Sequence, residues 1–580
     1  MDYTLKIGGE AGQGIQTVGD TLARVFSRSG YHVFTHQDYE SRVRGGHNFF
    51  QIRVSDTPVM ASREDIDILI AFDLESISEH AGEVKENGQI VYDSSALGKL
   101  KLQEDISRIN SLDIPFTQLA IEHGGSKIMA NTVATGAILG MLKMKLDVLE
   151  NIIKDTFKKK GEDIIKANIN AVRAGYDFAL KNCLTCRFVP ADTSKAKMLL
   201  NTVEAIGFGA LASGCKFYSA YPMTPSTGIM NYLADKEKDY GIIVEQAEDE
   251  IAAINMALGA SFAGVRAMTG SADGGFALMI EGLSLAAMTE TPVVICIGQR
   301  PAPATGLPTR TEQGSLLFVI NTAHGEFPRV VFAPGNPEQG MYLTNKAFDL
   351  AEKYQIPVFV MFDQYLSDAE WTYENFDLSK LKYQDYRIRG EALKSLAEYK
   401  RHAYTSTGVS PLGIPGESHH LIITDSDEHN EEGHLIEDAE TRIKMVHKRL
   451  FQKLPLIKKE IAPPLLYGDP EPEIIISGWG STYGIMKEAV DILSTQHKKI
   501  AMLHFSEVYP LPETDNFDYI SVLKNAKISI CIEQNATCQF AKLIRTETGF
   551  EFKYKINKYD GRPFTVDLLV KQINEKTRTD

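Results

Sequence analysis

The stretch CKFYSAYPMTPSTG, residues 215–228, decides the fold class. Its first six residues have the apolar and aromatic character of a strand. Pro222 and Pro225 then fix the backbone of a loop, which must lead directly into a helix. In α/β sheets, ligands bind beyond the carboxyl ends of the strands. Thr224, held between the two prolines, is therefore a candidate ligand-binding residue.

Strand-like and helix-like segments alternate on both sides of this stretch, which predicts an α/β protein with mostly parallel sheets. Near the N-terminus, the second strand is expected at His32–Phe34. We expect three α/β domains joined in part by a connecting segment of ordered loops. The expected domains are residues 1–190, 196–385 and 470–580, and the connecting segment is 386–469.

At 580 residues, with 43% hydrophobic and 24% charged residues, the chain can bury the cores of several domains of about 150 residues each. Asp and Glu outnumber Lys and Arg by 76 to 61, and the net charge of −15 argues against a nucleic-acid partner, which requires clustered cations. No apolar run approaches the roughly 20 residues that span a bilayer, and no signal peptide is expected. Six cysteines in this length do not form a disulfide framework, so we expect a cytoplasmic protein.

A glycine-rich turn, GGEAGQG at residues 8–14, follows the first strand. Its glycines give GxxGxG where the dinucleotide fingerprint requires GxGxxG. We also expect no acidic residue at the end of the second strand that could hold a ribose. The turn can bring backbone N–H groups and a helix N-terminus toward an anion, or its glycines can simply allow close packing. Gly12 and Gly14 are the candidate ligand contacts.

A second glycine site, RVRGGHN, occupies residues 42–48. Planar guanidinium groups beside a Gly-Gly bend can bind phosphates or carboxylates in a bidentate manner. Surface ion pairs are the alternative use of these arginines. Arg44 is the candidate anion ligand.

The segment QAEDE, residues 246–250, comes directly before an apolar run at 251–254. Acidic residues are ordinary in the first turn of a helix, because they interact favourably with its dipole. A carboxylate beside buried apolar surface has its charged form disfavoured, which suits proton exchange with a ligand nitrogen. The carboxylates of the segment from Glu245 to Glu250 are the candidates for that role.

Two arginines follow the strand expected at 293–297. Arg300 comes shortly after the strand, and Arg310 lies in the loop TGLPTRTE, residues 305–312. Both are suited to binding a carboxylate at the carboxyl end of that strand. Further on, the acidic loop DSDEH with a second histidine at 434 contains metal-binding residue types, but its spacing fits no metal template. We interpret it as a solvated loop and assign no metal site to the chain.

Together these motifs resemble the alpha subunit of 2-oxoacid:ferredoxin oxidoreductases, most closely the 2-oxoglutarate branch (2-oxoglutarate synthase). The resemblance rests on YPMTPST, QAEDE and TGLPTRTEQG, with GVSPLGIPG at 408–416 and KYDGRPF at 558–564. Residues 1–190 are similar to the gamma subunit of the same enzymes, fused here in front of the alpha-type region.

The resemblance implies that residues 196–385 bind the aminopyrimidine of thiamine diphosphate and that 470–580 form a domain similar to the transketolase C-terminal domain. The gamma-type domain is implicated in coenzyme A binding, which suits Gly12, Gly14 and Arg44. In the family, one glutamate hydrogen-bonds a pyrimidine nitrogen.

By its spacing to the helix, that glutamate is Glu250, with Glu248 as the alternative. The family's oxoacid contacts correspond to Thr224 and Arg310. The further cofactor contacts assigned through the same motif are Tyr221 and Pro222.

Two features of thiamine-diphosphate enzymes are missing from the sequence: a Gly-Asp-Gly stretch with a later Asn that holds Mg²⁺ and the diphosphate, and a run of cysteines for an iron–sulfur cluster. In the family, a beta subunit supplies the Mg²⁺ site and a 4Fe–4S cluster. The resemblance therefore implies an (αβ)2 heterotetramer in which thiamine diphosphate is shared between the two kinds of subunit.

The implied reaction is oxidative decarboxylation of a 2-oxoacid with coenzyme A, giving acyl-CoA, CO₂ and reduced ferredoxin. The expected substrate is 2-oxoglutarate, while pyruvate, branched-chain 2-oxoacids, the reverse direction and a non-catalytic assembly role stay open. The imperfect glycine fingerprint disfavours a nicotinamide-dependent dehydrogenase. Residues 270–275 read GSADGG where relatives usually carry TSGPG, so the resemblance does not predict the local shape of the site at this segment.

Overall fold

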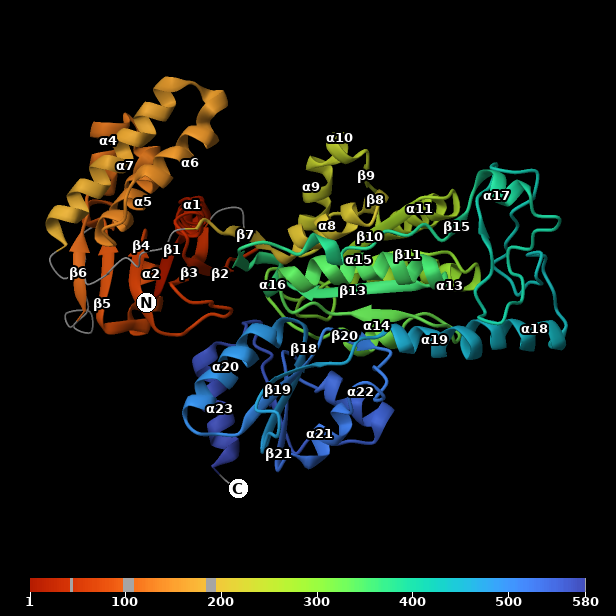
Figure 1. Cartoon of the computed structure of the whole chain (residues 1–580). Helices are drawn as coiled ribbons and strands as arrows, with labels where there is room; N and C mark the ends of the chain where they lie inside the picture. The colour runs from red at the N-terminus through yellow and green to blue at the C-terminus, as the bar shows by residue number, and fades with distance from the viewer. Residues whose placement is uncertain (42–44, 98–108, 184–194, 579–580) are drawn as a thin grey trace. The chain divides into compact units, whose positions relative to one another are not determined.

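The computed structural model describes residues 1–41, 45–97, 109–183 and 195–578 (Figure 1). The expected α/β class is confirmed, since helices alternate with strands gathered in three main sheets. The chain divides into two compact units. The first comprises Met1–Leu200, Asp368–Phe376 and Thr565–Leu568, and the second comprises the remaining residues. Among the described residues, no helix is long and apolar enough to cross a bilayer.

The first unit is built on a sheet of eight strands in the order β6-β5-β4-β1-β3-β2-β14-β7. Strands β4, β5 and β6 run parallel to β1, whereas β3 is antiparallel to both β1 and β2. The strands are β1 (Asp2–Ala11), β2 (His32–Asp38), β3 (Gly45–Ser55), β4 (Ile66–Ala71), β5 (Val84–Tyr92), β6 (Asn110–Asp113), β7 (Met198–Asn201) and β14 (Glu370–Tyr373).

Helices pack on both faces of this sheet. Successive residues of a strand face opposite sides, and a Cβ on Gly8 would meet Ser76 of α2 while one on Gly9 would meet Ile15 of α1. The longer helices are α1 (Ile15–Arg28), α2 (Leu74–His80), α4 (Phe116–Gly124), α5 (Ala130–Met141), α6 (Asp147–Phe157) and α7 (Glu162–Asn182).

The second unit contains a seven-stranded sheet in the order β20-β12-β13-β11-β10-β8-β9. All neighbours pair in parallel except β20, which is antiparallel to β12, so six strands end at the same edge. The strands are β8 (Cys215–Ala220), β9 (Ile243–Gln246), β10 (Arg266–Ala272), β11 (Val293–Gln299), β12 (Val330–Phe332), β13 (Pro357–Asp363) and β20 (Glu507–Tyr509). The helices that matter for the site are α9 (Thr227–Asp235), α11 (Glu250–Phe262), α12 (Asp273–Phe276), α13 (Ile280–Met288) and α14 (Leu316–Asn321).

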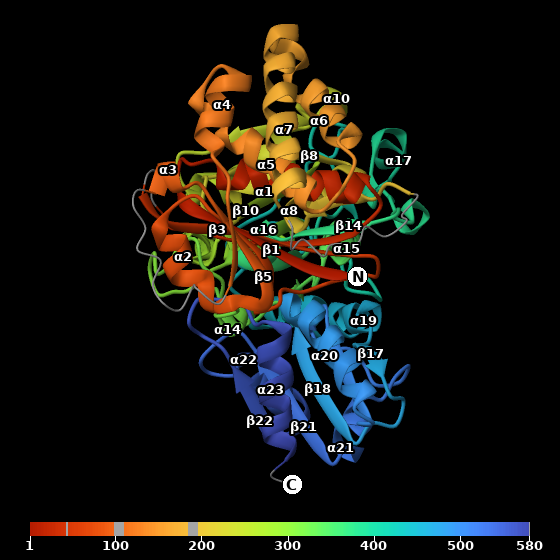
Figure 2. The same cartoon turned by 90° about the vertical axis from the view of Figure 1, so that its left-hand side faces the viewer.

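A five-stranded sheet in the order β17-β19-β18-β21-β22 forms the C-terminal part of the second unit. Helices α20 and α23 lie on one side of it and α21 and α22 on the other (Figures 1 and 2). Its elements are β17 (Leu465–Gly468), β18 (Ile474–Trp479), α20 (Tyr483–Thr495), β19 (Ile500–Phe505), α21 (Tyr519–Asn525), β21 (Ile528–Glu533), α22 (Gln539–Thr548), β22 (Tyr554–Asn557) and α23 (Val566–Thr577).

This C-terminal part braces the loop that carries Arg310. The Gln313 side chain donates to the carbonyl oxygen of Trp479 at 2.8 Å, and its backbone N–H donates to that of Gln534 at 2.7 Å. Gln313 and Trp479 are buried, and Trp479 belongs to the apolar core that the two sheets share. The position of the loop is therefore fixed from outside the seven-stranded sheet.

A buried carboxylate anchors the connecting segment, which contains α18 (Ala439–Val446), a π-helical turn (His447–Gln452) and α19 (Lys453–Glu460). Glu290 accepts hydrogen bonds from Lys448 at 2.6 Å, from His402 at 3.2 Å and from Lys453. The interpretation of the acidic loop as solvated is wrong at His429, whose fully buried ring lies 4.0 Å from that of His402. Burial lowers the pKa of both imidazoles. Within the described residues, no group of three or more metal-binding side chains gathers there or elsewhere.

Candidate functional site

The loop 221–226 lies against the carboxyl ends of β10 and β11. A Cβ added to Gly298, near the end of β11, would meet the Pro225 ring at 2.7 Å, so only glycine permits this close approach. The Arg300 guanidinium donates from Nη1 to the carbonyl oxygen of Thr224 at 2.8 Å. Thr224 and Arg300, which come from different loops, therefore lie together at one edge of the sheet.

Glu250 is the first residue of α11 and is buried, with 3% of its surface exposed. The preceding Asp249 caps the helix, since its side chain accepts the backbone N–H of Ala252 at 2.7 Å. Ser271, at the end of β10, donates its hydroxyl to Glu250 Oε1 at 3.2 Å. Glu248 is exposed, so the two candidate glutamates have different surroundings.

Gly275 presses against the Glu250 carboxylate. A Cβ at this position would lie 2.2 Å from both Glu250 Oε1 and Ser271 Oγ, distances that real side chains do not allow. An ionised carboxylate can accept about four hydrogen bonds, and Ser271 supplies one. Glu250 therefore keeps capacity for a ligand nitrogen and is held in place by its neighbours.

Arg310 is partly buried in the loop between β11 and α14. The next residue, Thr311, donates its backbone N–H to the carbonyl oxygen of Gly561 at 3.2 Å, so the KYDGRPF turn supports this loop. Arg300 is 7% exposed, and its Nε has no hydrogen-bond acceptor among the described residues. Tyr221 is 41% exposed, whereas Pro222 is partly buried.

Four residues near this site were not identified from the sequence: Ser271, Asp273, Gly275 and Glu312. Asp273 is buried and accepts the Ser315 hydroxyl at 2.6 Å. Burial and the negative charge of Asp273 raise the pKa of Glu312 to about 7. The one signal in the sequence that pointed to this region was the GSADGG segment, residues 270–275, which differs from the TSGPG expected from the family resemblance.

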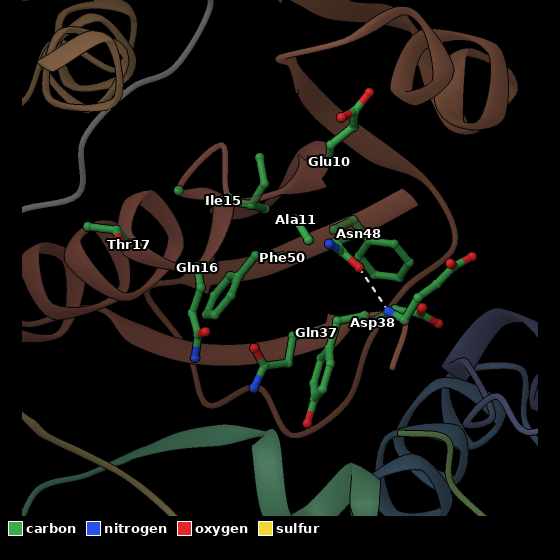
Figure 3. Close-up of a pocket in the computed structure, with 14 residues that line it drawn as sticks. Glu10, Ala11, Ile15, Gln16, Thr17, Gln37, Asp38, Asn48 and Phe50 are labelled. Carbon is green, nitrogen blue, oxygen red and sulfur yellow. Dashed lines mark hydrogen bonds between the residues drawn. The ribbon is translucent and has the colours of Figure 1, made fainter. Parts of the chain in front are cut away.

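The first unit holds a cavity of about 360 Å³ where β1 and β2 end and α1 begins (Figure 3). Gly12 and Gly14 line it, both with positive φ, at 96° and 78°. Arg44 lies outside the described residues. Figure 3 shows the amide side chains of Gln16, Gln37 and Asn48 beside the cavity.

The expectation that no acidic residue ends the second strand is wrong. Strand β2 runs on to Asp38, which lines the cavity opposite the glycine turn. Glu10 and Glu40 also line it. Three carboxylates suit N–H and O–H donors of a ligand, whereas phosphate groups are better placed at the glycine turn and the N-terminus of α1.

Comparison with known proteins gives consistent matches along the chain. The family model "Pyruvate flavodoxin/ferredoxin oxidoreductase, thiamine diP-bdg" matches residues 208–448, and "Pyruvate ferredoxin/flavodoxin oxidoreductase" matches residues 4–178. The chain is 32% identical to the 2-oxoacid:ferredoxin oxidoreductase subunit alpha of a Sulfolobus species, over 98% of this chain and 96% of that one. It is 27% identical to the 2-oxoglutarate oxidoreductase subunit KorA of Mycobacterium tuberculosis, over 88% of this chain and 82% of that one.

Among solved structures, the chain is similar to a 2-oxoglutarate:ferredoxin oxidoreductase from Magnetococcus marinus with 2-oxoglutarate, coenzyme A and succinyl-CoA bound. The two are 30% identical and superpose with a TM-score of 0.91 over 99% of each chain. The likeness therefore extends through both compact units.

Proposed function

The chain belongs to the alpha-subunit family of 2-oxoacid:ferredoxin oxidoreductases, and we propose that it provides the pyrimidine-binding half of an active site that oxidises 2-oxoglutarate. The products are succinyl-CoA and CO₂, and ferredoxin takes the electrons. The observation that carries this proposal is the buried Glu250 at the start of α11, fixed by Ser271 and Gly275.

The residues around Glu250 fit thiamine diphosphate. A buried carboxylate with spare hydrogen-bonding capacity suits a ring nitrogen, and the absence of a side chain at Gly275 leaves the space in which that carboxylate lies. When bound, thiamine diphosphate supplies the carbon nucleophile and electron sink for loss of CO₂. Glu250 holds and exchanges a proton at the ring nitrogen, because its buried carboxylate is fixed in one position by Ser271 and can reach a ligand atom there.

Thr224 and Arg310 bind the 2-oxoacid in this proposal. The Arg310 guanidinium can receive the carboxylate next to the oxo group through two parallel hydrogen bonds. The names of the relatives and the ligands of the Magnetococcus marinus structure favour 2-oxoglutarate over pyruvate and branched-chain 2-oxoacids.

Replacing Arg310 by alanine is expected to lower kcat/KM for 2-oxoglutarate by about 10- to 150-fold, because a charge-assisted hydrogen bond contributes about 1.5–3 kcal/mol. Steady-state assays of the assembled enzyme measure this. The control is Arg545→Ala, which removes an exposed arginine paired with Glu551 at 3.2 Å in the C-terminal part. Equal kcat/KM values for Arg310→Ala and the unmodified enzyme would remove Arg310 from the substrate site.

Coenzyme A binds in the first unit in this proposal, at the cavity lined by Gly12 and Gly14. The diphosphate lies at the glycine turn, and the amide-rich pantetheine arm meets the carboxylates Asp38 and Glu10. Arg44 is a further anion ligand in the proposal.

A beta subunit completes the site with Mg²⁺, the diphosphate-binding residues and a 4Fe–4S cluster, in an (αβ)2 assembly. Support comes from apolar side chains that stay exposed on α11, which begins at Glu250, and just before α13: Ile251 at 48%, Met256 at 41% and Leu278 at 51%. Ile251 also lines a groove of about 670 Å³, together with residues of α13 and with Arg442 and Arg449. Exposed apolar surface of this kind is typical of a subunit interface.

Replacing Met256 by aspartate is expected to weaken association with the beta subunit by about 30-fold or more, the range of an interface hot spot. Analytical ultracentrifugation of mixed subunits measures the dissociation constant. Ile128→Asp is the matched control, since Ile128 is 79% exposed but lies in the first unit. Equal dissociation constants for the two variants would exclude this face of α11 as the interface.

The function is tested by assembling the chain with its beta subunit and assaying viologen reduction. Reduction should require a 2-oxoacid, thiamine diphosphate and coenzyme A, and should be fastest with 2-oxoglutarate. An assembled complex without such activity would indicate an assembly subunit, and NAD reduction without ferredoxin would indicate a dehydrogenase.

A further inference from the structure

Asp273 is the one charged residue of the GSADGG loop, residues 270–275, and the proposed reaction assigns it no role. It begins α12 at the carboxyl end of β10 and is 4% exposed. Its carboxylate accepts the Ser315 hydroxyl at 2.6 Å and the Gly274 backbone N–H at 3.0 Å. The backbone N–H of Arg300 also donates to it. One carboxylate thus joins three separate segments of the chain.

These bonds hold both ends of the loop that carries Arg310. Arg300 begins the loop and Ser315 ends it. Ser315 is tied a second time, because its backbone N–H donates to Gln299 Oε1 at 3.2 Å. Arg300 in turn reaches the Thr224 carbonyl oxygen at 2.8 Å. Asp273 is therefore linked to Thr224 through Arg300 by hydrogen bonds, and it fixes both ends of the loop on which Arg310 lies.

The charge of Asp273 also matters for Arg300. A buried guanidinium requires a nearby negative charge, since an unpaired ion is costly in an apolar setting. Burial raises the pKa of Asp273, while Ser315, Gly274 and Arg300 act in the opposite direction and favour its charged form. The guanidinium of Arg300, which the sequence predicted to bind a carboxylate, thus interacts electrostatically with a carboxylate of the protein itself.

We propose that Asp273 is a positioning residue of the oxoacid site: it holds Arg300 and the loop 301–315 in the geometry through which Thr224 and Arg310 bind the 2-oxoacid. The proposal rests on the proposed function. In this proposal, the GSADGG loop fixes the position of substrate-binding groups that lie on other segments of the chain.

The test compares Asp273→Ala with Asp518→Ala in the assembled enzyme. Asp518 also accepts a seryl hydroxyl, that of Ser521 at 2.5 Å, and a backbone N–H at 2.9 Å, but it caps α21 in the C-terminal part. We expect Asp273→Ala to raise KM for 2-oxoglutarate about tenfold, the effect of losing one charge-assisted hydrogen-bond network, with kcat changed less than about twofold. Asp518→Ala should leave KM unchanged.

Two further variants separate positioning from folding. Ser315→Ala removes one of the three bonds and should raise KM by a smaller factor than Asp273→Ala. Asp273→Asn keeps an acceptor oxygen of similar position and should recover part of the lost affinity.

An unchanged KM in Asp273→Ala would overturn the proposal. So would a parallel loss of kcat, thiamine diphosphate binding and melting temperature, which would indicate a general structural role. Failure of the unmodified assembled enzyme to use any 2-oxoacid would instead contradict the proposed function, so the two failures are distinguishable.

Discussion

Glu250→Gln is expected to lower 2-oxoacid-dependent viologen reduction by about 10²–10⁴-fold, the usual effect of losing a positioned acid or base. Glutamine has nearly the same shape and can still accept the Ser271 hydroxyl, so the packing around it is retained. What is lost is the exchangeable proton at the ring nitrogen. Steady-state kinetics of the assembled enzyme at saturating thiamine diphosphate measure the loss in kcat.

Glu248→Gln is the matched control for this substitution. Glu248 lies two residues earlier and is exposed, so we expect its replacement to change kcat less than about threefold. Near-normal turnover in Glu250→Gln would contradict the assignment. A large loss confined to Glu248→Gln would transfer the role to Glu248.

Gly275→Ala is expected to cost about 10²-fold in kcat/KM even though it adds only a methyl group. The new Cβ would lie 2.2 Å from Glu250 Oε1 and from Ser271 Oγ, so the carboxylate must move. A displacement of about 1 Å in a catalytic group can reduce the rate by this amount. The variant therefore tests the position of Glu250 while leaving its chemistry intact.

The adjacent Gly274→Ala serves as the comparison. Its added Cβ would have one neighbour within 4 Å, the Ala304 carbonyl oxygen at 3.4 Å, which is ordinary van der Waals contact. The loss in kcat/KM should be at least tenfold smaller than that of Gly275→Ala. Similar losses in both variants would mean that the loop tolerates no added side chain. The loss in Gly275→Ala would then not be explained by displacement of the Glu250 carboxylate.

Local patterns in the sequence were sufficient for the α/β class and for the alternation of strands and helices around Thr224, because buried parallel strands are apolar and turns carry proline and glycine. They were not sufficient at Asp38. Thr35, His36 and Gln37 lack the apolar character of a strand, yet β2 continues through them because it pairs with β3 along its whole length.

The surroundings of the candidate site could not be predicted because they depend on contacts between distant segments. Ser271 meets Glu250 across 21 residues, and Gln313 meets Trp479 across 166. His429 looked solvated for the same reason, since its partner His402 comes from another part of the connecting segment. The sequence predicted a role for Glu250, but it did not predict the side chains that hold Glu250 in place.

The structure of the assembled complex with thiamine diphosphate and Mg²⁺ bound tests the central claim most directly. We expect the Glu250 carboxylate within about 2.6–3.2 Å of a pyrimidine ring nitrogen, while the beta subunit holds the diphosphate and the metal. A complex in which no side chain of this chain lies beside the ring, or in which this chain alone binds the whole cofactor, would contradict it.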